Sequence, residues 1–152
     1  METPSWPTPF PPSTSTSSSP PNAANPLSLA IRERLFPYMG GIMREIGASS
    51  LLVNGTHDHI HMLANFSTSL TIADAVRDLK SNSSSWVKET FSSDFAWQTG
   101  YAAFSVSKSG VDTVLHYITT QEQHHRGMTF QEEYLAFLRK YDVPYDERFV
   151  FD

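Results

Sequence analysis

The feature that most limits the fold is the uneven distribution of proline along the 152 residues. Eight of the ten prolines fall in residues 1–27, beside a Ser/Thr run from Ser13 to Ser19, and this part has no Lys or Arg. Such a sequence has little apolar surface to offset the entropy that ordering costs, so we expect residues 1–27 to be disordered or extended. They also lack the basic start and apolar block of a secretory signal. One globular domain is therefore expected over residues 28–152.

Composition and charge exclude several classes of protein. Because the chain has no cysteine, it can form neither a disulfide nor a thiolate zinc site, and no run approaches the roughly 18 apolar residues of a membrane span. The net charge of −5 argues against a broadly basic nucleic-acid surface. Residues 129–152, however, carry six acids against three bases, whereas residues 28–128 carry nine acids against eight bases. A near-neutral body that binds a divalent cation can still hold a short DNA segment.

The spacing of apolar residues predicts alternating helical and extended segments. Thr71-x-x-Asp74 and Thr129-x-x-Glu132 are capping signatures that mark two helix starts. The order of the segments predicts an α+β fold in which helices cover an antiparallel sheet. The expected elements are helices over residues 28–46, 71–91, 109–125 and 129–141, and strands over residues 50–56, 59–66 and, as one bent strand or a pair, 95–107.

The densest group of potential metal ligands is His57-Asp58-His59-Ile60-His61. Residues two apart on a strand face the same side, so His59 and His61 should lie next to each other with Ile60 toward the core. The two imidazoles can share one divalent cation, and Asp58 either orients an imidazole or caps the turn. A half-exposed strand that is merely rich in histidine accounts for the pattern equally well.

Tyr117 and Gln121 lie four residues apart in a predicted helix and should share one face. Gln121 could supply a carbonyl oxygen to a metal, with the phenol of Tyr117 nearby. A phenol is a weak nucleophile at neutral pH because its ordinary pKa is about 10, but a metal that polarises a phosphate removes much of this handicap. Taken alone, the helix favours a core tyrosine and a solvated glutamine. The sequence has no phosphate-binding glycine loop, HExxH or GxSxG, so nucleotide hydrolysis, zinc proteolysis and serine hydrolysis have no support.

Together, His59-Ile60-His61 and Tyr117-x-x-x-Gln121 resemble the motifs of HUH endonucleases with a single catalytic tyrosine. This family comprises insertion-sequence transposases and REP-associated tyrosine transposases. The resemblance extends from about residue 29 to the end of the chain. Further similar stretches are residues 31–41, 58–63, 79–86, 95–101, 121–125 and 145–149.

The resemblance implies a ferredoxin-like antiparallel sheet and a homodimer, in which the tyrosine helix of one subunit often lies against the histidines of the other. It implies Mg²⁺ or Mn²⁺ bound by His59, His61 and Gln121. Tyr117 would attack single-stranded DNA, leaving a 5′-phosphotyrosyl link and a free 3′-OH, and the reverse attack would reseal the strand without ATP. The substrate would be hairpin DNA with unpaired bases, and the site of action the bacterial cytoplasm, at the nucleoid when DNA is bound. Candidate DNA-backbone contacts are Lys80, Asn82 and Ser83.

The N-terminal part of the chain departs from the family pattern. Members begin with a strand in the centre of the sheet, beside the histidine strand. Residues 1–27 are instead rich in proline, which lacks the donor that a central strand needs. We therefore expect the first strand to be missing or replaced, which would leave the His59 strand with an open edge.

Two other functions remain open from the sequence. A metal-dependent phosphodiesterase would use His59 and His61 to activate water and would need no covalent tyrosine. A relative that has lost catalysis would bind DNA or a partner subunit without cutting.

Overall fold

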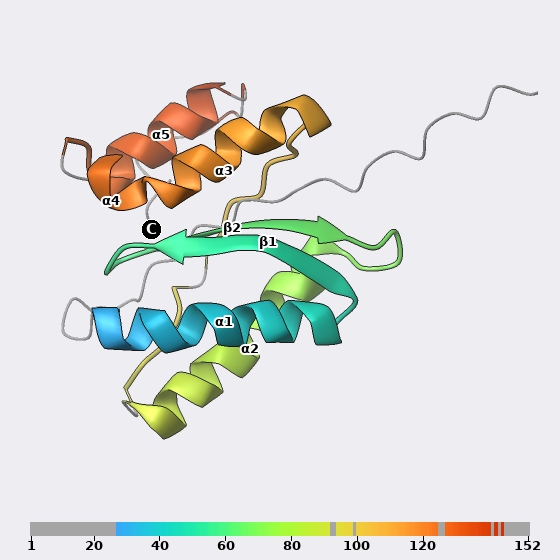
Figure 1. The fold of residues 1–152 in the computed structure, drawn as a ribbon, viewed down its shortest axis with the longest axis vertical. Helices are drawn as coiled ribbons and strands as arrows, with labels where there is room; N and C mark the ends of the chain where they lie inside the picture. The colour runs from blue at the N-terminus through green and yellow to red at the C-terminus, as the bar shows by residue number, and fades with distance from the viewer. Residues whose placement is uncertain are drawn as a thin grey trace, which may run out of the picture.

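A computed structural model describes residues 27–91, 94–98, 100–124, 127–140, 142 and 144. In these residues a two-stranded antiparallel hairpin lies between two groups of helices (Figure 1). Helices α1 and α2 lie on one side of the hairpin, and α3, α4 and α5 lie on the other. The elements are α1 (Leu29–Glu45), β1 (Ala48–Gly55), β2 (Ile60–Phe66), α2 (Ile72–Thr90), a 3₁₀ turn (Lys108–Gly110), α3 (Val111–Thr119), α4 (Gln121–His124) and α5 (Phe130–Lys140).

The hairpin of β1 and β2 is the centre of the fold. Its register sets Asn54 of β1 opposite His61 of β2. Glycine is required at position 55, where β1 ends, because a Cβ there would lie only 2.3 Å from the main-chain oxygen of His59. Nearly all of β2 is buried, since helices cover both faces of the hairpin. The predicted pair of strands is therefore confirmed.

Helix α1 confirms the first predicted helix. The Ser28 side chain accepts a hydrogen bond from the Ile31 amide at 3.4 Å and caps the start, and the helix continues through Pro37. Gly47 follows its end with a φ of 87°, a left-handed conformation that glycine adopts readily. Before the helix, Leu27 is fully buried and its main-chain N–H donates to a carbonyl of the hairpin turn at 2.8 Å. The buried residues of α1 are Ile31, Leu35, Met39, Ile42 and Met43.

Helix α2 begins at the predicted cap, because the Thr71 hydroxyl accepts a hydrogen bond from the Asp74 amide at 3.1 Å. It packs against α1, where Tyr38 and Trp86 stack with ring centroids 4.7 Å apart. The two helices and the hairpin share one hydrophobic core. The buried residues of α2 are Ala75, Val76, Leu79, Ser83 and Val87.

The strand predicted over residues 95–107 is wrong: the described residues of this segment form no strand. Side chains from α2 hold it instead. The Lys80 ammonium donates to two of its main-chain carbonyls at 2.7 and 2.6 Å, and the Trp97 indole donates to the Ser83 hydroxyl at 2.8 Å. Phe95 is buried in the core. The Gln98 and Gly100 carbonyls are therefore bound by a side chain of α2, and the described residues of the segment have an irregular backbone.

The helix predicted over residues 109–125 is divided into α3 and α4, with a break at Thr120. Hydroxyls at the break donate to carbonyls four residues earlier, from Thr119 to Leu115 at 2.7 Å and from Thr120 to His116 at 2.9 Å. Side-chain hydrogen bonds of this kind bend helices. The break decides where the following residue, Gln121, points.

The predicted α+β class, with helices packed on an antiparallel sheet, is confirmed. Residues 1–26 of the segment expected to be disordered, where the first strand was expected to be missing, lie outside the described part of the chain. At Leu27, the last residue of that segment, the expectation is wrong, because Leu27 is buried and hydrogen-bonded to the hairpin turn. No helix in the described ranges is both long and apolar enough to span a membrane.

Candidate functional site

His59 and His61 lie side by side where the hairpin turn enters β2, which begins at Ile60. Their ring centroids are 5.1 Å apart, and both side chains are buried, with 0% and 3% of their surface exposed. Ile60, between them, belongs to the hydrophobic core, as alternation along a strand requires. The predicted juxtaposition is confirmed, and the alternative of a half-exposed strand is not found.

Asp58 holds the His59 imidazole in one orientation. Its Oδ1 lies 2.6 Å from His59 Nδ1, and the Thr56 hydroxyl donates to the same oxygen at 2.6 Å. Because a carboxylate only accepts, Nδ1 donates a hydrogen bond to it, and Nε2 is the ring nitrogen that faces the buried site. Partial burial favours the protonated carboxyl, but the hydrogen bonds from His59 and Thr56 outweigh it and hold the pKa of Asp58 below its usual range. Of the two roles expected for Asp58, the structure supports orientation of the imidazole.

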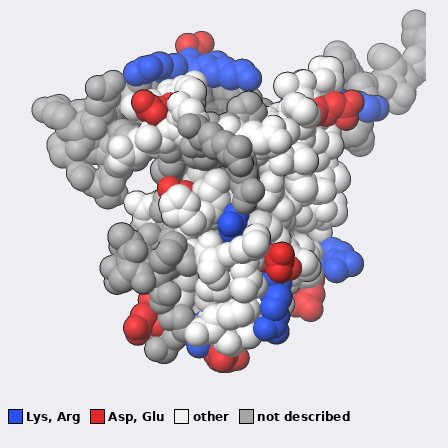
Figure 2. Space-filling model, turned by 60° about the vertical axis from the view of Figure 1, so that its left-hand side comes forward, with Lys and Arg blue, Asp and Glu red and all other residues white. Residues whose placement is uncertain are grey.

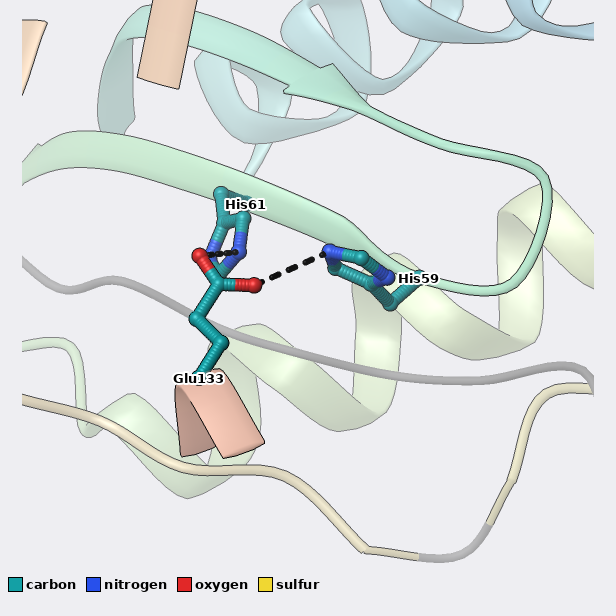
Figure 3. A group of neighbouring side chains, drawn as sticks. All are labelled: His59, His61 and Glu133. Atoms are coloured by element: carbon teal, nitrogen blue, oxygen red, sulfur yellow. Dashed lines mark ion pairs between the residues drawn. The ribbon is translucent and has the colours of Figure 1, made fainter. Parts of the chain in front are cut away.

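A third buried group, Glu133 of α5, is one that the sequence analysis did not single out. Its carboxylate oxygens lie 3.6 Å from His59 Nε2 and 3.7 Å from His61 Nε2 (Figure 3). One ligand atom from each of the three residues lies within 4.8 Å of the other two. A sequence signal was present, because Glu133 stands on the apolar stripe of its helix, three residues after Phe130 and four before Phe137.

Gln121 lies between His59 and Glu133. It is fully buried, its Oε1 is 3.4 Å from His59 Nε2, and its Nε2 donates to Glu133 Oε1 at 3.1 Å. The amide oxygen of Gln121 therefore faces Nε2, the ring nitrogen of His59 that does not contact Asp58. A metal cation or a proton between these two atoms would stabilise the contact. The alternative of a solvated glutamine is not found, and Gln121 lies beside His59.

Tyr117 occupies the last turn of α3, and its ring centroid lies 6.0 Å from that of His61. Its side chain is partly exposed, whereas His61 is buried. Burial lowers the pKa of His61, although contact with Glu133 opposes the shift, so the imidazole is neutral at pH 7. Neutral imidazole is the form that binds metals. The tyrosine helix thus lies against the histidines of its own chain.

The chemistry of these groups fits a divalent cation. Imidazole nitrogens, a carboxylate and an amide oxygen are all common metal ligands. The Glu133 carboxylate supplies negative charge that would offset the charge of a cation in this buried site. The mixed nitrogen and oxygen donors suit a transition-metal cation such as Mn²⁺ better than Mg²⁺, which prefers oxygen ligands.

The three predicted DNA contacts lie on α2, on the other side of the hairpin from α3 (Figure 1). Lys80 is half-buried and bonded to main-chain carbonyls, and Ser83 is fully buried. Asn82 is exposed and donates to a carbonyl of its own helix at 2.8 Å. His57, 70% exposed, and His116, also exposed, stay outside the buried cluster. The structure brings none of these residues to His59 and His61.

The distribution of charged side chains on the face shown in Figure 2 does not indicate a DNA-binding surface. Acidic and basic side chains are mixed there and lie mostly at the upper and lower ends of the view. His125, Arg126 and the similar stretch at residues 145–149 lie outside the described residues.

Comparison with protein-family models matches residues 22–121 to the IS200-like transposases. The chain belongs to this family. The matched segment is well over half of the chain and contains His59, His61, Tyr117 and Gln121, whereas Glu133 lies beyond it. The family predicted from the two motifs is therefore confirmed. No curated protein matches the sequence.

Two solved structures have a similar fold. The first is a crystal structure of a candidate transposase from Deinococcus radiodurans R1, with a TM-score of 0.60 and 16% identity, covering 80% of this chain and 97% of that one. The second is a REP-associated tyrosine transposase bound to a REP hairpin, with a TM-score of 0.59 and 11% identity, covering 85% of this chain and 76% of that one. At these identities the similarity concerns the fold, and it agrees with the predicted fold class.

Proposed function

We propose that this IS200-like transposase is a single-stranded DNA endonuclease and strand transferase that uses Tyr117 as its nucleophile. The observation that carries the proposal is the position of a partly exposed tyrosine beside His61, at the edge of a buried group of metal-ligand side chains. Membership of the transposase family supports action on DNA. The contact lies within one chain, so a homodimer, which we also propose, would carry two such sites.

In the proposed reaction the Tyr117 oxygen attacks the phosphorus of a phosphodiester. A bond forms between that oxygen and phosphorus, the bond from phosphorus to the 3′ oxygen breaks, and the phenol proton is lost. The leaving 3′ oxygen takes up a proton and becomes a free 3′-OH, while the phosphate, still attached to the 5′ oxygen of the fragment on the 3′ side of the cut, becomes linked to the tyrosine. Attack by a 3′-OH reverses these steps, so the bond energy is kept and no ATP is consumed.

His59, His61 and Glu133 would hold Mg²⁺ or Mn²⁺, with Gln121 as a further ligand. When bound, the cation would withdraw electron density from the phosphate and offset the charge of the transition state. Asp58 would keep the Nε2 lone pair of His59 directed into the site.

We further propose that the substrate is a DNA hairpin with unpaired bases, because a similar fold has been solved with a REP hairpin. Lys80, Asn82 and Ser83 stay as proposed backbone contacts. The exposure of Asn82 and partial exposure of Lys80 favour these two over Ser83, which is fully buried.

The proposal is tested with a 3′-labelled hairpin oligonucleotide and Mn²⁺, because the fragment on the 3′ side of the cut becomes bound to the protein. The wild-type chain should form a labelled covalent adduct, and Tyr117→Phe should form none. Tyr38→Phe is the matched control, since Tyr38 stacks on Trp86 and phenylalanine can keep that contact. Loss of the adduct in Tyr38→Phe as well would point to a general defect in folding.

Other outcomes would replace the proposal. Cleavage that survives Tyr117→Phe would indicate a phosphodiesterase in which the cluster of His59, His61 and Glu133 activates water. Hairpin binding without cleavage under any divalent cation would indicate a relative that has lost catalysis.

A further inference from the structure

Asn54 joins the histidine hairpin to the tyrosine helix. It lies on β1 directly opposite His61. Its side-chain amide donates to the main-chain oxygen of Ile118 at 2.7 Å and also reaches that of Thr119 at 3.4 Å. A single amide group thus links the strand pair that carries the histidines to the last turn of α3.

The carbonyls that Asn54 binds belong to the end of a helix. Carbonyls in the last turn of a helix form the negative end of the helix dipole. An amide N–H suits this position, whereas a carboxylate would be repelled by it. Tyr117 lies in the same turn, immediately before Ile118, so a shift of this turn would move the phenol relative to His61.

We propose that Asn54 is a positioning residue that fixes α3, which carries Tyr117, against the hairpin of β1 and β2 that carries His59 and His61 in the same chain. The inference rests on the proposed function and deepens it, because it separates the placement of Tyr117 from the binding of metal. Ile118 is fully buried and keeps α3 attached to the core. Loss of the Asn54 hydrogen bonds should therefore displace the end of the helix without detaching it.

The first experiment compares Asn54→Ala and Asn54→Asp with the wild type in the adduct assay. A displacement of about 1 Å at a reacting group can cost about 100-fold in rate, so we expect losses of roughly tenfold in Asn54→Ala and about 100-fold in Asn54→Asp. Mn²⁺ affinity should stay within about twofold of the wild type, because neither variant removes a proposed ligand. Ser67→Ala, which removes an exposed hydrogen bond to Ser69, is the control and should keep the wild-type rate.

A second experiment reads the position of α3 without any activity. The chain has no cysteine, so two spin labels can be placed uniquely at Leu51→Cys on β1 and Thr113→Cys on α3, both exposed positions. In a sample diluted with unlabelled chain, so that a dimer carries one labelled subunit, pulsed electron paramagnetic resonance should give one narrow distance with Asn54 present. A broader or shifted distribution is expected with Asn54→Asp, and an intermediate one with Asn54→Ala.

The two readouts separate failure of this inference from failure of the proposed function. If the wild type forms no adduct, the proposed chemistry is wrong, and the distance measurement alone decides the role of Asn54. If both variants keep the wild-type distance and, where there is an adduct, the wild-type rate, the inference is overturned. Should Asn54→Asp fail to fold, Asn54→Ala and Asn54→Ser provide the same comparison.

Discussion

Replacement of Asp58 by alanine should lower the affinity of the buried cluster for Mn²⁺ by about tenfold. The carboxylate lies 2.6 Å from His59 Nδ1 and fixes the ring that presents Nε2 to the site. Loss of such an outer partner of a metal-bound histidine costs about 10- to 100-fold in affinity. We expect the lower end, because the Asp58 side chain is 42% exposed and Thr56 Oγ1 lies only 3.0 Å from the same ring nitrogen.

The Thr56 hydroxyl provides a sharper form of this test. In Asp58→Ala it can accept the Nδ1 proton in place of the carboxylate, so the double variant Thr56→Val/Asp58→Ala should lose about 100-fold, as expected when no outer partner is left. Asp58→Asn keeps an accepting oxygen and should lose only about two- to threefold, because the hydrogen bond is no longer charge-assisted. Calorimetric titration with Mn²⁺ measures all four proteins. Wild-type affinity in the double variant would refute the assigned role of Asp58.

Three other substitutions or conditions test separate features. Gly55→Ala should destabilise the fold by about 1–3 kcal/mol, because the new Cβ would clash with main-chain atoms. Gly40→Ala is the control and should cause no such clash, because there is open space around Gly40. Urea unfolding measures the stability of both variants. Burial lowers the pKa of His61 in the folded chain, so the unfolded chain binds a proton at this residue first as pH falls below about 6.5. The free energy of unfolding of the metal-free protein should therefore decrease from pH 7 to 5. The decrease should be smaller in His61→Asn. Glu133→Gln should weaken Mn²⁺ binding at least tenfold by removing a ligand charge from the buried site, whereas Glu132→Gln, at an exposed helix cap, should leave it unchanged in the same titration.

The spacing of residues along the sequence correctly predicted those features that depend on a single helix or strand. The buried stripe of α1, the cap at Thr71 and the two-residue period of His59 and His61 each follow from spacing along a single element. The segment at residues 95–107 has the composition of a strand, but its carbonyls are bound by Lys80, a contact from another helix. Contacts between distant segments leave no local pattern, so this part was predicted wrongly.

The candidate site likewise contains residues that sequence spacing predicted and others that only tertiary contacts place. Sequence spacing found His61, Tyr117 and Gln121, but it predicted one uninterrupted helix for the last two. The break at Thr120 depends on side-chain hydrogen bonds whose formation the spacing does not determine. Glu133 reaches the histidines because α5 lies on the same side of the hairpin as α3. This tertiary arrangement cannot be predicted from the residues of α5 alone.

The hydrogen bond from Gln121 to Glu133 bears on where this transposase can be shortened. The segment by which the family is recognised ends at residue 121, and the acceptor of that bond stands 12 residues later. A fragment that ends at residue 121 would keep both motifs, but it would lack α5. The Gln121 amide would then lose the Glu133 carboxylate as its acceptor, and the two imidazoles would lose their contact with it. A fragment that keeps the whole ligand cluster therefore extends at least into α5, and homologues that align only over the motifs should be inspected for an acid in this later helix.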